Sequence, residues 1–178
     1  MEFSGIVARI EEAHPSAVIE QVVDEEVTKD PFAVLDAERL REVMQTLRDD
    51  GNLAFDLLLS VAAVDYPEAQ PKAKKKADPP PDPIPGRFEL VYHMLSSVRN
   101  HRFVVKIKLP HVERPVAPTV CDIYPTAEWH EREAWDLMGV HFHDHPDMRR
   151  VLCVLDWVGH PLRKDYVFPT EYHGISCE

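Results

Sequence analysis

Cysteine and glycine are both scarce in this chain of 178 residues, which has three of the first and six of the second. The cysteines stand singly, at Cys121, Cys153 and Cys177, and no two have CxxC spacing. Neither a disulfide framework nor an iron–sulfur or zinc site can be assembled from these three cysteines alone. A glycine-rich loop that would cradle a nucleotide phosphate is also missing. The sequence therefore predicts a reduced chain without nucleotide, flavin or cluster of its own.

Long apolar runs are missing as well. The strongest run near the middle, Leu57 to Val64, is far shorter than the ~20 residues that cross a bilayer. The first fifteen residues show neither a basic-then-apolar secretory pattern nor an arginine-rich transit pattern. We therefore expect a chain that is soluble where it is made and associates with a membrane only through other proteins.

Acidic residues are in excess, 31 against 20 lysines and arginines, which gives a net charge of -11. The excess lies mainly in residues 1–65, which hold 15 acids and 5 lysines or arginines. This balance argues against nucleic acid or anionic lipid as the main partner. Hydrophobic residues make up 44% of the chain, enough for one domain with its own core.

Apolar periodicity predicts alternating helices and strands in the first two thirds of the chain. The expected elements are a helix at 4–12, a strand at 17–28, a helix at 37–48 capped by Asp36, and strands at 55–64, 88–94 and 103–109. The last two strands form a hairpin around 99–101. This order predicts an α+β fold, with a ferredoxin-like, mixed but mainly antiparallel sheet, helices on one face and an extended C-terminal arm.

An insertion at 67–85 interrupts this pattern, with seven of the 16 prolines and four lysines. Such a composition predicts a flexible loop between two strands. It is either a solvated insertion without function or a docking loop for a partner. We expect an α+β domain over 1–125 that contains this insertion, and a second segment over 126–178 with a motif helix and a subunit-docking arm.

The motif helix is predicted from Thr126, as N-cap, to Met138, with Gly139 as its stop. One face carries a charged row at i, i+4 and i+8, made of Glu128, Arg132 and Asp136. Such a row indicates ion pairing along the helix or with a neighbouring segment.

A second face of this helix places Glu133 between Trp129 and Leu137. We expect Glu133 to meet a cationic or hydrogen-bonding group rather than open water. Glu131 and Glu133 point about 200° apart on a helix, so they cannot flank one substrate bond as a catalytic pair. Two roles remain for Glu131 and Glu133, which are structural ion pairing and contact with another subunit.

Three histidines alternate at His141, His143 and His145, and on a strand they would share one face. Imidazoles so placed could bind zinc or copper. The chain must turn at Pro146, and no spacing fixes a fourth ligand. Two interpretations remain open: the histidines lie on the surface or at an interface, or they form a metal site.

The stretch from Asp156 to Tyr166 has glycine and proline every few residues together with large apolar side chains. It has too many breakers for a long helix and too much apolar surface for a solvated tail. Two alternatives remain for this stretch of the C-terminal arm. It either wraps its own domain, or it lies on another subunit, with Arg163 and Lys164 paired to acids there.

Three motifs in order, EREAWDLMG, HPDMRR and DWVGHPLRKDY, closely resemble the 30 kDa subunit of respiratory complex I, the NADH:quinone oxidoreductase. The resemblance is strong over about 122–166. By position it implies a subunit interface of Glu131, Arg132, Glu133, Asp136, His145, Pro146, Asp147, Arg149, Arg150, Asp156, Trp157, Gly159, His160, Pro161, Leu162, Arg163, Lys164, Asp165 and Tyr166.

The resemblance further implies a peripheral-arm subunit that packs against the 49 kDa subunit, which lines the quinone pocket. NADH, FMN, the iron–sulfur clusters and quinone would be bound elsewhere in the complex, and this chain would hold no cofactor, metal or catalytic residue. The location implied is the cytoplasmic side of the bacterial inner membrane, reached through the complex. Alternatives are the equivalent subunit of a membrane-bound hydrogenase or other-donor quinone reductase and, less favoured, a free-standing metal-binding protein built on the histidines.

Overall fold

A five-stranded sheet forms the centre of the protein in the computed structural model, which describes residues 1–24, 30–70 and 82–177. Its strands are β1 (Val18–Val22), β2 (Phe32–Leu35), β3 (Leu57–Tyr66), β4 (Arg87–Ser96) and β5 (His101–Pro110). In space they follow the order β1-β2-β5-β4-β3. All neighbours are antiparallel except β2 and β5, which are parallel.

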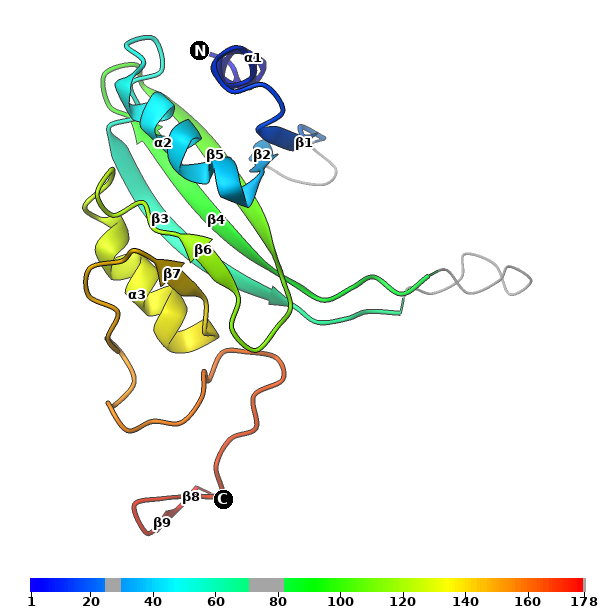
Figure 1. Ribbon diagram of the computed structural model, residues 1–178, viewed down its shortest axis with the longest axis vertical. Helices are drawn as coiled ribbons and strands as arrows, with labels where there is room; N and C mark the ends of the chain where they lie inside the picture. Colours follow the sequence, from blue (N-terminus) through cyan, green and yellow to red (C-terminus); the bar gives the residue numbers. More distant parts are fainter. Residues whose placement is uncertain (25–29, 71–81, 178) are drawn as a thin grey trace.

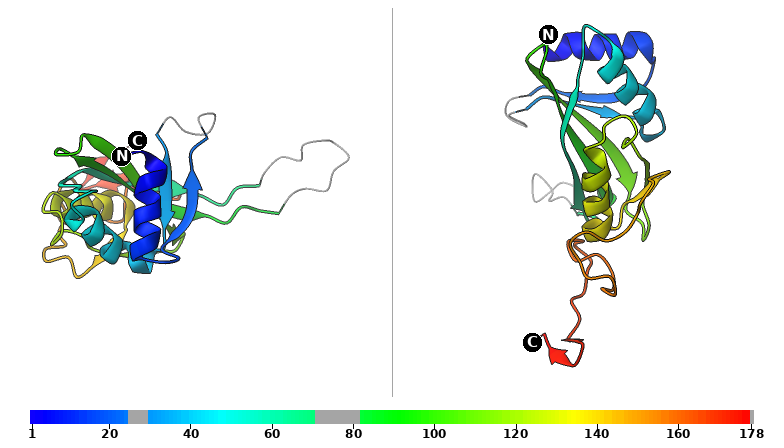
Figure 2. Two further views of the ribbon diagram at one scale, coloured as in Figure 1. Left: turned by 90° about the horizontal axis from the view of Figure 1, so that it is seen from above. Right: turned by 90° about the vertical axis from the view of Figure 1, so that its left-hand side faces the viewer.

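Four helical segments accompany the sheet: α1 (Phe3–Ala13), the 3-10 turn η1 (Ala37–Arg39), α2 (Leu40–Asp49) and α3 (Ala127–Met138). Figures 1 and 2 show α1, α2 and α3 on the same face of the sheet. The predicted α+β class, with a mainly antiparallel sheet and helices on one face, is confirmed.

The β4–β5 hairpin forms because its apolar residues alternate. Tyr92 pairs with Val105 and Leu90 with Ile107, and all four side chains are buried beneath the helices. The opposite face is more polar: there Glu89 forms ion pairs with Arg87 at 2.8 Å and Lys106 at 3.5 Å. This hairpin and its polar outer face agree with the sequence prediction.

Helix α2 also follows its sequence pattern. Its four apolar residues at i, i+3, i+4 and i+7 are fully buried: Leu40, Val43, Met44 and Leu47. Asp36 accepts a hydrogen bond from the backbone N–H of Glu38 at 3.0 Å, which satisfies a donor at the start of the helical segment. The predicted cap is therefore confirmed.

Strand β2 was not predicted, because its four residues directly follow the Asp30-Pro31 turn and show no alternation. Ala33, Val34 and Leu35 are each at most 1% exposed, since β2 lies between β1 and β5. The strand predicted at 17–28 is shorter, ending at Val22, and 25–28 lies outside the described residues. Residues 71–81 of the predicted loop at 67–85 also lie outside the described residues. In the described part of this loop, Ala69 and Ile84 form a bridge that extends the β3–β4 ladder.

A second, small sheet pairs β6 (Val116–Pro118) in parallel with β7 (His141–His143). Ala117, Phe142 and, from α3, Ala134 belong to the same buried core as the main sheet. Helix α3 thus packs on the sheet of the preceding segment. In the part of the chain that the structure describes, no helix is long and apolar enough to cross a membrane.

Residues 151–177 form the arm, which leaves the end of the sheet remote from the N-terminus (Figure 1). Its regular structure is limited to a short hairpin of β8 (Glu171–Tyr172) and β9 (Ile175–Ser176). The predicted extended arm is therefore present.

Candidate functional site

The motif residues gather on helix α3 and on the two loops that cover it. The helix ends at Gly139, whose φ of +78° allows the left-handed turn predicted for it. Thr126 stands at the N-cap position, as predicted, but its side chain makes no capping hydrogen bond. Its hydroxyl donates to the Leu58 carbonyl at 3.1 Å and so ties the helix start to β3. The faces bearing Glu131 and Asp136 are buried.

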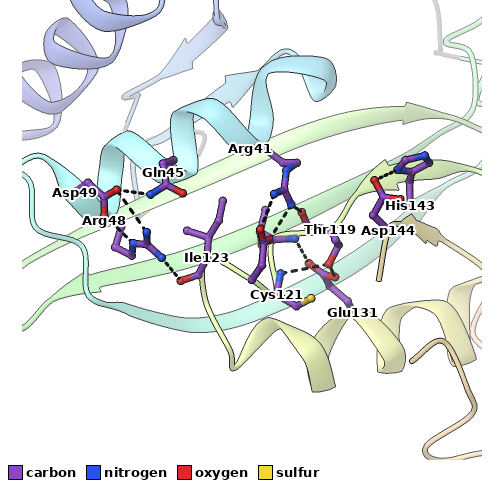
Figure 3. A network of polar contacts seen from close by, with 12 residues as sticks. Arg41, Gln45, Arg48, Asp49, Thr119, Cys121, Ile123, Glu131, His143 and Asp144 are labelled. Carbon is purple, nitrogen blue, oxygen red and sulfur yellow. Dashed lines mark hydrogen bonds and ion pairs between the residues drawn. The ribbon is translucent and has the colours of Figure 1, made fainter. Parts of the chain in front are cut away.

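Glu131 is fully buried and contacts the loop after β6 (Figure 3). The Thr119 hydroxyl and the Val120 N–H both donate to its carboxylate, the latter at 2.8 Å. Burial raises the pKa of Glu131 to about 7, although both hydrogen bonds oppose the shift. Next to it, Arg41 forms a two-pronged ion pair with Asp122, at 2.8 and 2.6 Å, and ties α2 to the same loop.

Asp136 is also fully buried but behaves in the opposite way. One carboxylate oxygen accepts the backbone N–H groups of Val151, Leu152 and Cys153, at 2.8 to 2.9 Å, and the other pairs with Arg150. Burial alone would raise its pKa, but these donors outweigh it and lower the pKa of Asp136 to about 2. The carboxylate therefore holds the start of the arm.

Arg150 extends this contact along the arm. Its guanidinium donates to the carbonyls of Trp157 at 2.7 Å and Gly159 at 2.9 Å. His160 Nδ1–H donates to the Asp136 carbonyl at 3.0 Å. The two segments 150–153 and 157–160 are therefore anchored at one point on α3.

The HPD-x-RR turn covers the next turn of the helix. Arg132, which is 4% exposed, donates to the Arg149 carbonyl at 3.2 Å and lies 3.8 Å from the Asp147 carboxylate. His145 donates through Nε2–H to the Glu128 carbonyl and accepts the Asp147 N–H at Nδ1, both at 3.1 Å. Of the charged row predicted on α3, the side chains of Arg132 and Asp136 are thus bound by this turn and by Arg150, whereas Glu128 contributes its backbone carbonyl.

The three alternating histidines are not brought together. The side chain of His143 pairs with Asp144, whereas His145 lies against α3. Among the described residues, one group of three potential metal ligands has all its ligand atoms within 4.8 Å: Cys121, Glu131 and His145. Both nitrogens of His145 already form hydrogen bonds, so coordination there would break one of them.

Arg163 contacts its own domain, as in the first of the two alternatives for the arm. Its guanidinium donates to the carbonyls of Val112 and Glu113, lies 5.0 Å from the Phe88 ring centre and pairs with Asp165. This side chain is therefore engaged within its own chain, and its pairing with a partner's acids stays a prediction. Lys164 is exposed, and its backbone N–H donates to buried Asp65 at 2.8 Å.

Trp157 forms the centre of a small aromatic cluster in the arm. Its ring centre lies 5.6 Å from that of Phe168 and 5.2 Å from that of Tyr172. The Tyr172 hydroxyl donates to Asp156 at 2.9 Å. The Trp157 Nε1–H is buried without a hydrogen-bond partner. This cluster joins segment 156–157 to the end of the arm, away from the main core.

Most other large apolar side chains of the arm are exposed. They are Leu152 (64%), Val154 (51%), Leu155 (84%), Val158 (84%), Leu162 (56%), Val167 (85%), Phe168 (58%) and Ile175 (70%). A segment with this many exposed apolar side chains is typical of a surface that another protein covers.

Glu133 departs from its prediction, since it is exposed and points into solvent rather than to a cation. It borders a hollow of about 140 Å³ between α3, β3 and Leu162. Sequence reasoning also missed Thr119, Val120 and Arg41, which surround Glu131. Thr119 and Val120 lie in an irregular loop and Arg41 lies on α2, so no spacing rule connects them with Glu131.

Comparisons with known proteins agree with this arrangement. The family model for the respiratory-chain NADH dehydrogenase 30 kDa subunit matches residues 33–172. A subunit of the NADH-quinone oxidoreductase of Mycobacteroides abscessus is 35% identical over 97% of this chain and 69% of its own length. The equally named subunit of Maricaulis maris is 42% identical over 72% of this chain, and the match spans only 56% of that relative.

Two solved structures share the fold. One, described as Nqo5 of a trypsin-resistant fragment, gives a TM-score of 0.56 at 29% identity over 80% of this chain and 98% of its own. A chain of an archaeal membrane-bound sulfane sulfur reductase gives 0.67 at 28% identity over 92% of this chain and 85% of its own. The match over 33–172 and the relatives along nearly the whole chain show that this protein belongs to the 30 kDa subunit family of respiratory-chain NADH dehydrogenases.

Proposed function

We propose that this chain is a peripheral-arm subunit of proton-translocating NADH:quinone oxidoreductase, complex I. In this proposal it packs against the 49 kDa subunit, which lines the quinone pocket, and lies on the cytoplasmic side of a bacterial inner membrane through the complex. The observation that carries the proposal is the exposed apolar surface of the arm, residues 151–177. The family and the relatives named for NADH-quinone oxidoreductase supply the identity of the assembly.

The arm combines exposed apolar side chains with a backbone that is hydrogen-bonded to the folded domain. Leu155 and Val158 are each 84% exposed, while the backbone around them is held by Asp136 and Arg150. A preformed apolar surface loses little conformational freedom on binding, so more of its burial energy remains for affinity. The arm is therefore suited to permanent rather than transient contact.

The contribution of the chain to electron transfer is rigid binding surface. NADH, FMN, iron–sulfur clusters and quinone would be bound by other subunits, and no side chain here is proposed to act on them. The buried charges on α3 support this role, because each has its partners inside the chain: Glu131 with Thr119, and Asp136 with Arg150.

The test is assembly in the host from which the gene comes. An affinity-tagged chain carrying Leu152→Ser and Leu155→Ser should retain about tenfold less of the 49 kDa subunit than the unchanged chain, since two exposed anchors are lost. The matched control is Val98→Ser, which removes another exposed apolar side chain (75%) in the β4–β5 turn. Equal recovery of the 49 kDa subunit with all three chains would refute the proposal.

A second candidate is the equivalent subunit in an assembly fed by another electron donor. The chain of the sulfane sulfur reductase favours it, with a TM-score of 0.67. The same tagged preparation separates the two candidates. Co-purified flavin- and NADH-binding subunits with NADH oxidation support complex I, and their replacement by a nickel-binding large subunit supports the hydrogenase type.

A further inference from the structure

A groove of about 1100 Å³ opens where the arm meets the rest of the chain. One wall is the segment 111–114 that follows β5, a second is the C-terminal end of α3, and the third is the arm from Val158 to Val167. The groove lies beside the exposed apolar surface of the arm and is continuous with it through Val158.

The walls of this groove are held in place from within the chain. Arg163 ties the arm to segment 111–114 through the carbonyls of Val112 and Glu113. Gly139 and Gly159 both have left-handed φ angles, and their neighbours fit only glycine. A Cβ on Gly139 would lie 2.6 Å from His160, and one on Gly159 would lie 2.8 Å from Tyr166. The groove therefore exists before any partner arrives.

Some of the charged side chains that line the groove already have a partner within the chain, and others do not. The Nε2 of His111 lies 2.9 Å from a carboxylate oxygen of buried Asp65, and Arg163 pairs with Asp165. Within the described ranges, the side chains of Arg114 and His141 form neither an ion pair nor a hydrogen bond. These are available for binding.

His160 adds no donor to this pair. Its Nδ1–H is committed to the Asp136 carbonyl, so Nε2, which lies against Gly139 at the groove wall, is the accepting nitrogen of the neutral ring. Glu113 is the acid of the lining that is not paired, and it is exposed beside Arg114. The groove therefore offers more cationic and donor groups than free carboxylates, in a chain whose net charge is -11.

We propose that this groove binds a segment of a neighbouring subunit that carries an acidic side chain flanked by apolar ones. The carboxylate meets Arg114 and His141, and the apolar side chains pack on Val158 and Val167, which are 84% and 85% exposed. A protein segment fits better than a small anion because the groove continues into the apolar arm surface. This inference rests on the proposed function and adds to it the chemistry of the partner.

Burial, the nearby Arg114 and His143 all lower the pKa of His141. Burial is the largest of these causes, and the lowered pKa keeps the imidazole neutral at pH 7, so His141 meets a carboxylate as an N–H donor.

The test uses a photo-crosslinking amino acid in the affinity-tagged full chain, expressed in its own host. One chain carries it in place of Glu113, at the groove, and another in place of Leu155, on the arm. Crosslinked peptides are identified by mass spectrometry. Each is repeated with Arg114→Glu and, as matched control, with Arg102→Glu, another exposed arginine on β5.

We expect the Glu113 position to crosslink to a peptide of another subunit that contains aspartate or glutamate between apolar residues. Arg114→Glu should reduce this crosslink about tenfold or more, because like charges then face each other, whereas Arg102→Glu should leave it within about twofold. The crosslink from Leu155 should persist in both variants.

Two outcomes would overturn the inference. If Leu155 crosslinks to another subunit while Glu113 crosslinks to nothing, to its own chain or to a peptide without an acid, the groove proposal is wrong and the proposed function stands. If neither position crosslinks to another subunit, the proposed function fails and the groove proposal fails with it.

Discussion

The sheet domain and the arm (151–177) hold their apolar side chains in opposite environments. Phe88 and Tyr92 in β4 are fully buried, whereas Leu155 and Val158 in the arm are each 84% exposed. The sheet completes its own core, but the arm is held mainly by hydrogen bonds to Asp136, Arg150 and Arg163. The position of the arm is therefore set by polar contacts within the chain, which leaves its apolar surface free for another protein.

The largest effect should come from removing the carboxylate on which the arm depends. Asp136→Ala leaves Arg150 without its partner and three backbone N–H groups without an acceptor. We expect the free energy of unfolding to fall by about 3–5 kcal/mol. Urea unfolding of the isolated chain measures this loss, and Glu133→Ala, at an exposed site on the same helix, should change it by less than about 0.5 kcal/mol.

Acid should reproduce this loss in the unchanged chain. The pKa of Asp136 is lowered to about 2 from a usual 3.8, so the folded state holds the charged form more strongly than the unfolded state. Its stabilisation is complete above pH ~4 and is lost as the pH falls toward about 2. Amide exchange at residues 151–153 should accelerate first over this range. Unchanged exchange there, with unfolding elsewhere, would contradict a role of Asp136 in holding the arm.

A smaller effect of opposite sign is expected five residues earlier on the same helix, at Glu131. Its pKa is raised to about 7 from a usual 4.5, so the folded state binds a proton that the unfolded state has released. Stability should therefore decrease as the pH rises from about 4.5 to 7. Glu131→Gln keeps the shape without the charge and should stabilise the chain at pH 8 by about 2–3 kcal/mol. Urea unfolding at pH 5 and pH 8 checks this, and a variant with an unchanged pH slope would refute it.

The sequence predicted those parts of the molecule that local periodicity determines. Helix α2 and the β4–β5 hairpin follow from apolar spacing alone. Asp136 lies on a face that the sequence marked as charged, but its partners are 14 to 17 residues away, and no spacing rule connects them. Glu133 was mispredicted for the same reason, because the loops at 119–121 and 145–153 cover Glu131 and Asp136 instead. Contacts between distant segments decide which face of a helix is buried.

A moderate effect should separate two adjacent cations of the arm. Arg163→Ala removes two bonds to the carbonyls of Val112 and Glu113 and the contact with the Phe88 ring. We expect a loss of about 1–2 kcal/mol in the isolated chain. Lys164→Ala removes an exposed side chain and should cost less than about 0.5 kcal/mol. Equal losses in thermal unfolding of the two variants would mean that Arg163 does not hold the arm to the sheet domain.

The smallest effect on stability is the sharpest test of the comparison. Leu152→Ser with Leu155→Ser changes two side chains that are 64% and 84% exposed and leaves every hydrogen bond to Asp136 in place. The free energy of unfolding of the isolated chain should therefore change by less than about 0.5 kcal/mol. Fully burying a leucine in the sheet is worth about 1.5–3 kcal/mol, and the same pair of changes there would unfold much of the chain. A large loss of stability in the isolated chain with both substitutions would mean that these leucines pack on their own domain. The arm would then belong to the core and not to an interface.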